Sequence, residues 1–302
     1  MIRLGYACIN TRLPSPNRTC RLKNASPERI IELARYNLDA LYEVLQWNRD
    51  HGVQVFRISS ETIPFGSHEI NRMDWPEILG PLLDRIGLFI RENGMRVSMH
   101  PGQFTVLNSP KQQVVDNAVA DLAYHDRLLE GFGLDARHKI VLHVGGVYGD
   151  REAAAHRFTD AHARLPGSVK RRLIIENDEK SFNAEAVLAI AGELSIPMVF
   201  DVFHHACLPS FDGRSPRWII ERAAATWSAE DGRPKIHYSD QWVGKQAGAH
   251  SESIDLKAFG RFYETIRDMD LDVMLEVKDK ERSVLAVYDE RPELAGEGAA
   301  RP

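Results

Sequence analysis

Short runs of apolar, β-branched residues alternate along the chain with longer segments in which apolar residues recur every three or four positions. The longer segments predict helices, and several carry start and stop signals. Ser26 and Pro27 form an N-cap followed by proline at the first helical position, and Gly52 follows the same helix. The short runs predict eight strands, at Ile2–Cys8, Val53–Ser59, Arg96–His100, Lys139–Val144, Arg172–Asn177, Pro197–Phe203, Lys235–Asp240 and Asp272–Lys278.

The strand and helix patterns alternate eight times, which predicts one α/β domain, a (β/α)8 TIM barrel over residues 1–290. A doubly wound open sheet is the alternative, but Gly5–Asn10 lacks the GxGxxG loop after the first strand. Residues 291–302 are rich in Gly, Ala, Pro and Glu and are predicted to form a disordered tail. The other predicted helices are Trp75–Asn93, Lys111–Phe132, Asp150–Leu165, Ala184–Leu194, one that begins at Ser215 and Pro216, and Leu256–Met269.

The composition of the 302 residues excludes several classes of protein. No stretch approaches the roughly 18 apolar residues of a membrane span, and the first ten residues do not form a signal peptide, so we expect a cytoplasmic protein. Three cysteines are too few for a disulfide framework or a cysteine-type zinc site. The formal charge of −5 alone argues weakly against a nucleic-acid partner. Nothing in the sequence indicates a protein partner.

Residues of metal-ligand type fall at the ends of successive predicted strands. In a barrel these ends converge on one face, which carries the active site. Nine side chains are expected there: His100, His143, Glu176 and Asp201 at strand ends, His204 just beyond, His237 and Glu276 within strands, and His68 and His250 in loops. The other histidines of helices and helix ends are expected in solvent, namely His51, His125, His138, His156 and His162.

Side-chain alternation predicts that the carboxylates point inward. Glu176 lies two residues after Ile174 and therefore shares its face of the strand, and Asp201 and Glu276 lie on strands with the same pattern. Buried carboxylates need compensating cations. Mixed imidazole and carboxylate ligands suit Zn²⁺, Mn²⁺ or Fe²⁺. The set is too large for one ion, so we expect two or three, an arrangement typical of phosphoester cleavage.

Lys235 lies two residues before His237, on the same face of the strand, and so points toward the expected cations. A protonated amine would be repelled there. The side chain is therefore neutral, aimed at a phosphate, or carboxylated to become an anionic ligand. The remaining alternative is an ordinary lysine in solvent at the start of a strand.

Two loops at the same face carry residues suited to a nucleic acid. The loop after the first strand contains Arg12, Arg18, Arg21 and Lys23 with no acidic residue before Glu28, which is an electrostatic footprint for a polyanion. After the third strand, Pro and Gly form a tight loop that presents Gln103 and Phe104. An aromatic ring can enter a base stack while an amide replaces lost pairing hydrogen bonds.

With these residues the chain resembles the UV damage endonucleases, a family of DNA repair enzymes. HPGQ together with KIHYS is specific for that family, whereas any one segment alone is not. The matching segments are Leu4–Asn10, Arg57–Ser60, His100–Phe104, Leu142–Gly146, Ile175–Asp178, Phe200–His205, Lys235–Ser239 and Met274–Glu281.

The resemblance implies a TIM barrel that nicks damaged double-stranded DNA immediately 5′ of cyclobutane dimers, 6-4 photoproducts and abasic sites, leaving 3′-hydroxyl and 5′-phosphate ends. It implies up to three divalent ions, usually manganese, held by the nine residues above. Lys235 would be carboxylated and would act with Glu176 and His237 in catalysis. Gln103 and Phe104 would probe the DNA opposite the lesion, and Tyr6 and Asn10 would lie near the lesion pocket.

Three other functions stay open on the sequence. They are an apurinic-site endonuclease with the same barrel, a metal-dependent sugar isomerase, and a damage-binding protein that does not cut. The sequence lacks the long N-terminal extension of fungal relatives, so we expect no organelle or nuclear targeting and a protein that acts at the bacterial nucleoid.

Overall fold

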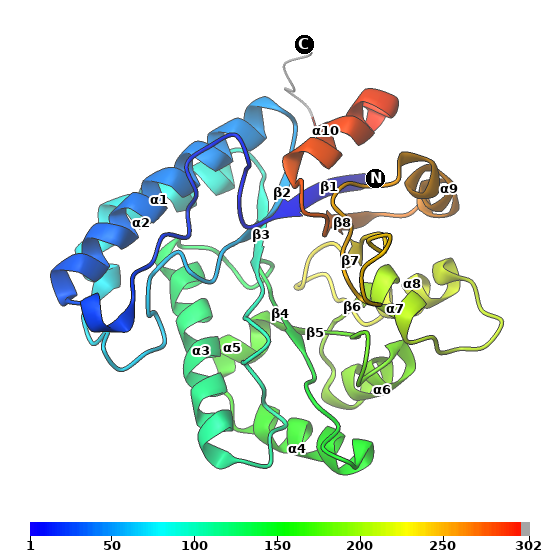
Figure 1. The fold of residues 1–302 in the computed structure, drawn as a ribbon, viewed down its shortest axis with the longest axis horizontal. Helices are drawn as coiled ribbons and strands as arrows, with labels where there is room; N and C mark the ends of the chain where they lie inside the picture. Colours follow the sequence, from blue (N-terminus) through cyan, green and yellow to red (C-terminus); the bar gives the residue numbers. More distant parts are fainter. Residues whose placement is uncertain (297–302) are drawn as a thin grey trace.

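The computed structural model describes residues 1–296, and its eight parallel strands close into a barrel (Figure 1). Each strand pairs with the next, and β8 closes the barrel by pairing with β1, where Ile2 lies opposite Leu271. This closed order confirms the predicted TIM barrel and excludes the open sheet. The strands are β1 (Ile2–Ala7), β2 (Val55–Ile58), β3 (Arg96–Met99), β4 (Ile140–His143), β5 (Leu173–Glu176), β6 (Met198–Asp201), β7 (Lys235–Tyr238) and β8 (Leu271–Leu275).

The helices surround the strands, and every helix predicted from the sequence is present (Figure 1). Ser26 caps α1 by accepting a hydrogen bond from Arg29 N, with Pro27 at the first helical position. Among the described residues, none of the helices is both long enough and apolar enough to cross a membrane. The helices are α1 (Pro27–Asp50), α2 (Trp75–Glu92), α3 (Gln112–Gly131), α4 (Arg151–Ala163), α5 (Gly167–Arg172), α6 (Ala184–Leu194), α7 (Val202–Cys207), α8 (Pro216–Ala224), α9 (Leu256–Ile266) and α10 (Glu281–Glu290), with the 3-10 helices η1 (Leu22–Asn24) and η2 (Pro292–Leu294).

The start of the predicted tail differs from the expectation of disorder. Leu294 is buried in the core, and Gly296 N donates a hydrogen bond of 2.9 Å to Gly52 O. An apolar contact and a backbone hydrogen bond hold this segment against the barrel, and a composition averaged over the tail does not reveal them. Residues 297–302 lie outside the described residues.

The main core lies between the strands and the helices. Two small apolar clusters are separate from it. One contains Val141, Ile174 and Val199, and the other contains Ala7, Val55 and Met274. Every second residue of a strand points the same way, so the residues two positions further along also point into the barrel. The predicted inward carboxylates therefore lie directly beyond an apolar layer.

A network of buried charges closes the opposite, N-terminal end of the barrel. Asp272 accepts hydrogen bonds from Arg3 Nε at 2.7 Å and from Arg96 Nη1 at 2.8 Å. Burial alone would raise the pKa of Asp272, but the two guanidinium groups lower it. The protein thus supplies its own counterions at this end, as a buried carboxylate requires.

The expectation that the helical histidines lie in solvent is wrong for His125, His138 and His162, which are all buried. His138 is 8% exposed, and its Nδ1 accepts a hydrogen bond of 3.2 Å from Val97 N. The ring must therefore be neutral, with its proton on Nε2. Burial, with repulsion from Arg96 and Arg172, lowers the pKa of His138 to about 4.

This buried ring makes stability depend on pH. The unfolded chain takes up a proton near pH 6.5, before the folded state does, so stability from the neutral ring is present above about pH 6.5. It is lost as pH falls to about 4. We expect His138→Asn, which keeps an acceptor but cannot titrate, to reduce this acid destabilisation by up to about 3 kcal/mol.

Urea unfolding of the wild type and the variant between pH 7 and pH 4 measures this difference. His156→Asn is the matched control, because His156 is exposed on α4. Parallel pH curves for the wild type and His138→Asn would contradict the assignment.

Candidate metal centre

Glu176, the last residue of β5, lies at the centre of a buried cluster at the C-terminal mouth of the barrel. Its Oε1 is 2.6 Å from Nδ1 of His237, and its Oε2 is 3.0 Å from Nε2 of His100 and 3.7 Å from Nε2 of His143. Burial, together with the carboxylates of Glu276 and Asp201, raises the pKa of Glu176 well above its ordinary value.

Three groups of ligand-type side chains meet at Glu176. Within each group, one ligand atom per residue lies within 4.8 Å of the others. A carboxylate common to all three can bridge neighbouring cations, as in two-metal sites. The groups are His100, His143 and Glu176; Glu176, Asp201 and His204; and Glu176, His237 and Glu276.

The contact between His100 and Glu176 needs a proton or a cation. Nδ1 of His100 lies 3.1 Å from the Pro101 carbonyl oxygen, which can only accept, so Nδ1 carries the ring proton. Burial lowers the pKa of His100 well below its ordinary value, so its Nε2 is unprotonated. Two acceptors 3.0 Å apart then share a proton held by Glu176, or bind the same cation. A divalent ion fits this position by replacing the proton.

Asp201 and His204 are arranged by the start of α7. Asp201 caps this helix, with Oδ1 accepting a hydrogen bond of 2.7 Å from His204 N, while Oδ2 is buried without a partner. His204 Nδ1 donates to the Asn177 carbonyl oxygen at 3.0 Å, which leaves Nε2 free. A histidine that bonds a carbonyl through one nitrogen and ligates through the other is typical of metal sites.

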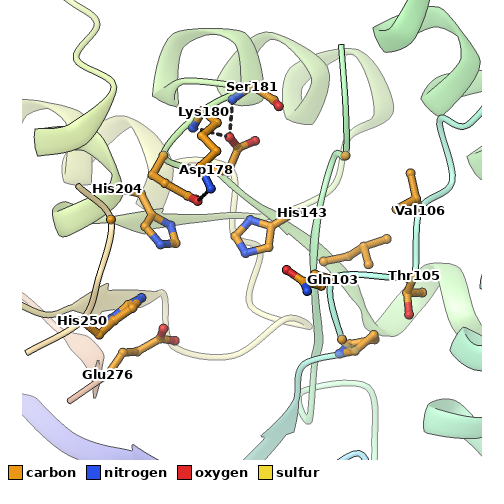
Figure 2. Close-up of a pocket in the computed structure, with 16 residues that line it drawn as sticks. Gln103, Thr105, Val106, His143, Asp178, Lys180, Ser181, His204, His250 and Glu276 are labelled. Carbon is orange, nitrogen blue, oxygen red and sulfur yellow. Dashed lines mark hydrogen bonds and ion pairs between the residues drawn. The ribbon is translucent and has the colours of Figure 1, made fainter. Parts of the chain in front are cut away.

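Unpartnered polar atoms line the mouth. Among the described residues, Nδ1 of His143 and Nδ1 of His250 are buried without a hydrogen-bond partner. These side chains line a cavity of about 390 Å³ together with Glu276, His204 and Gln103. Figure 2 shows the rings of His143 and His204 turned toward each other, 5.6 Å between centroids, with His250 and Glu276 to one side. Buried polar groups normally have a hydrogen-bond partner. These unpartnered ring nitrogens are therefore suited to bind cations.

Arg57 belongs to the site although its role is not predicted from the sequence. Its Nη2 donates to Nε2 of His237 at 3.0 Å and forms an ion pair with Glu276. Because Arg57 can only donate, the proton of neutral His237 lies on Nδ1 and points to Glu176. One feature of the sequence could have indicated this role. Arg57 lies two residues after Val55, so it shares the inward face of an apolar strand.

Lys235 is 1% exposed, which excludes the alternative of a lysine in solvent. Its Nζ donates a hydrogen bond of 2.7 Å to Ser98 Oγ, below the layer of His237. Burial, followed by repulsion from Arg96, lowers the pKa of Lys235 well below its ordinary value. A lowered pKa favours the neutral amine, which is the form that carboxylation by CO₂ requires.

His68 is placed outside the cluster. It is exposed in the loop between β2 and α2, and its Nδ1 accepts a hydrogen bond of 3.1 Å from Ile70 N. It is not among the described residues that line the cavity. A role as ligand would require this loop to move toward the mouth.

Tyr6 and Asn10 are also not exposed at the mouth. The Tyr6 hydroxyl donates to Asn48 Oδ1 of α1 at 2.6 Å, and Asn10 Nδ2 donates to that hydroxyl at 3.1 Å. Tyr6 thus points between the barrel and α1 rather than into the lumen. Asn10 Oδ1 accepts from Arg12 N at 3.0 Å, so this pair shapes the start of the first loop.

The predicted DNA-contacting groups of the first loop and of the Gln103–Phe104 turn are exposed. Arg12, Arg18, Arg21 and Lys23 are all on the surface of the first loop, with the Arg18 guanidinium 3.8 Å from the centroid of the Tyr36 ring. Gln103 is exposed, and Phe104 is 83% exposed. A large aromatic side chain so exposed beside a polar cavity is typical of a binding surface.

Comparisons with known proteins agree with the geometry. The profile of the family described as UV-endonuclease UvdE matches residues 2–298. The UV DNA damage endonuclease of Clostridium perfringens is 41% identical over 295 residues, which cover 97% of this chain and 71% of that protein.

Solved structures give the same result. The crystal structure of SacUVDE superposes with a TM-score of 0.92 at 38% identity, covering 97% of this chain and 99% of that one. Endonuclease IV from Thermus thermophilus shares the fold, with a TM-score of 0.59 at 12% identity over 96% of this chain and 99% of that one. The chain therefore belongs to the UV-endonuclease UvdE family of DNA repair endonucleases.

Proposed function

We propose that the protein nicks double-stranded DNA immediately 5′ of cyclobutane dimers, 6-4 photoproducts and abasic sites. Hydrolysis would leave 3′-hydroxyl and 5′-phosphate ends. The observation that carries this proposal is the sharing of Glu176 by three groups of ligand-type side chains at the barrel mouth. Family membership supports the DNA substrate.

Two or three divalent ions, manganese by analogy with the family, would be held by the nine predicted ligands, with a carboxylated Lys235 as a further one. His68 would join them only after its loop moves. Divalent ions bound there would supply Lewis acidity to the scissile phosphate and lower the pKa of an attacking water. Carboxylation adds CO₂ to the neutral amine of Lys235 and releases one proton.

The protein's own groups orient these ligands. The Asn177 carbonyl fixes the ring of His204, while Arg57 and Glu176 contact the two ring nitrogens of His237, so a cation bound by His237 would replace one of these contacts. Of the expected catalytic residues, Glu176 and His237 are in contact, whereas Lys235 lies two residues earlier on β7 and bonds to Ser98. Because they sit on rigid strands rather than loops, their relative positions change little when DNA binds.

Recognition of damage would use the exposed groups around the mouth. Phe104 would stack in the space left by flipped nucleotides, while the Gln103 amide would bond to the unpaired bases opposite them. The lesion lowers the cost of flipping because it already weakens pairing and stacking. The basic first loop would contact the phosphates.

A plasmid assay tests the activity. With Mn²⁺, the protein should convert UV-irradiated supercoiled plasmid to the nicked form, leave unirradiated plasmid intact, and lose activity with EDTA. A duplex with one photodimer should give a single product that a polymerase can extend from its 3′-hydroxyl. Faster cleavage of an abasic duplex than of the dimer would favour the apurinic-site alternative. Supercoiled irradiated plasmid that survives metal-loaded protein would contradict the proposal.

Glu176→Gln should weaken binding at all three groups, because each contains this carboxylate. We expect Mn²⁺ affinity to fall by more than about ten-fold and nicking to be lost. The metal-free variant should be at least as stable as the metal-free wild type, since one of three crowded carboxylates is gone.

Metal analysis after dialysis and thermal unfolding with and without Mn²⁺ measure these effects, because a bound ion stabilises the folded state by mass action. Glu92→Gln, an exposed carboxylate at the end of α2, is the control. Full metal content in Glu176→Gln would rule out its role as a shared ligand.

Phe104→Ala should lower kcat/KM on the photodimer duplex by about ten-fold or more, the range expected for losing one base-stacking contact. Phe104→Tyr should retain activity because the ring face is kept. Leu88→Ala, an exposed apolar residue on α2, controls for general surface effects. Equal kcat/KM for Phe104→Ala and the wild type would show that the ring does not contact the DNA.

A further inference from the structure

We propose that Asp121 of α3 is a positioning residue that fixes the Gln103–Phe104 turn to the loop that carries His68. The carboxylate touches neither the metal-ligand cluster nor the exposed ring of Phe104. It acts through the hydroxyl groups of two neighbouring loop residues. This inference rests on the proposed role of the turn in probing DNA.

Gln103 and Phe104 are the two central residues of a β-turn. The turn is closed by a hydrogen bond of 2.9 Å from Thr105 N to Gly102 O. Thr105, directly after Phe104, is buried, and its Oγ1 donates a hydrogen bond of 2.6 Å to Asp121 Oδ2. The tip of the turn is in solvent while its C-terminal end is anchored to a helix.

The second oxygen of the same carboxylate holds the other loop. Ser67 Oγ donates a hydrogen bond of 3.0 Å to Asp121 Oδ1. Ser67 directly precedes His68, the predicted ligand from the loop between β2 and α2. One partly buried carboxylate thus joins two loops that come from different strands of the barrel.

The rest of this helix face holds the His68 loop as well. Tyr124 and His125 lie three and four residues after Asp121 and share its face. The Tyr124 hydroxyl donates to Ser60 O at 2.8 Å, and Nε2 of His125 lies 2.8 Å from Ser60 Oγ. A Cβ on Gly66 would lie 2.2 Å from the Tyr124 ring, so the loop packs directly against it.

A fixed turn matters because Phe104 is exposed and gains contacts only when DNA is bound. A preordered turn loses less conformational entropy on binding than a mobile one. Hydrogen bonds to a carboxylate are roughly twice as strong as those between neutral groups, so Asp121 is a better anchor than an amide. Loss of the hydrogen bond from Thr105 to this anchor should weaken damage recognition through the turn, while the strand-borne ligands of the cluster stay in place.

Paired variants at Thr105 test this prediction in the full-length, Mn²⁺-loaded enzyme. Thr105→Val removes the hydroxyl and keeps the shape, whereas Thr105→Ser keeps the hydroxyl. We expect Thr105→Val to raise KM for the photodimer duplex by about ten-fold or more with kcat within about two-fold, which corresponds to losing one charge-assisted hydrogen bond. Thr105→Ser should restore the wild-type KM. The same KM for both variants would overturn the proposal.

Hydrogen exchange measured on DNA-free protein gives a readout that does not depend on activity. Asp121→Ala should speed amide exchange both at 102–106 and at 63–68, Thr105→Val only at the first segment, and Ser67→Ala only at the second. Asp116→Ala is the control, because Asp116 is exposed on the same helix and bonds only to Gln112 within it. Asp121→Ala with the exchange pattern of Asp116→Ala would overturn the proposal.

These two measurements separate the outcomes. An enzyme that does not nick irradiated DNA, yet shows the expected exchange pattern, contradicts the proposed function and leaves Asp121 as the link between the loops. Normal nicking by every variant contradicts the role of Asp121 and leaves the proposed function intact.

Discussion

The burial of Glu176 among other carboxylates is the constraint on which the site depends. Burial and the carboxylates of Glu276 and Asp201 raise the pKa of this side chain, whereas the guanidinium of Arg57 lowers it. Each carboxylate is placed by a rigid element, Glu176 at the end of β5 and Asp201 at the cap of α7. The crowding therefore cannot relax by moving the side chains apart. Divalent ions bound there would relieve this crowding, as metal binding to a carboxylate cluster does in general.

The two ends of the barrel handle buried charge in opposite ways. At the N-terminal end, Asp272 is neutralised within the chain by Arg3 and Arg96, so nothing further is needed there. At the C-terminal mouth, buried ring nitrogens such as Nδ1 of His143 are left without partners on side chains that line an open cavity. An apolar layer that includes Ile174 separates the ends. The paired charges at the N-terminal end stabilise the fold. The polar groups without partners at the C-terminal ends of the strands are available to bind ligands, as is usual for this fold.

The sequence predicted what depends on periodicity and missed what depends on tertiary packing. Strand order and the inward direction of Glu176 follow from alternation, and both are confirmed. The anchoring of Leu294 and the burial of His125 depend on neighbours distant in the sequence, so no local pattern reveals them. The exposed position of His68 has the same origin. It lies on a loop whose conformation is set by contacts with α3, and a motif match specifies the residue but not the loop.

The formal charge of −5 is a poor guide to the partner because it counts all acidic residues alike. Glu176 is grouped with Asp201 on one side and with Glu276 on the other, and each divalent ion bound there would add two positive charges at the surface that DNA would approach. Arg12 and the other basic residues of the first loop are exposed at that same end of the barrel. Electrostatic attraction acts over about one Debye length, roughly 8 Å at physiological salt. What matters for DNA is therefore the local charge around the mouth, and the position of the acidic residues, rather than their number, decides its sign.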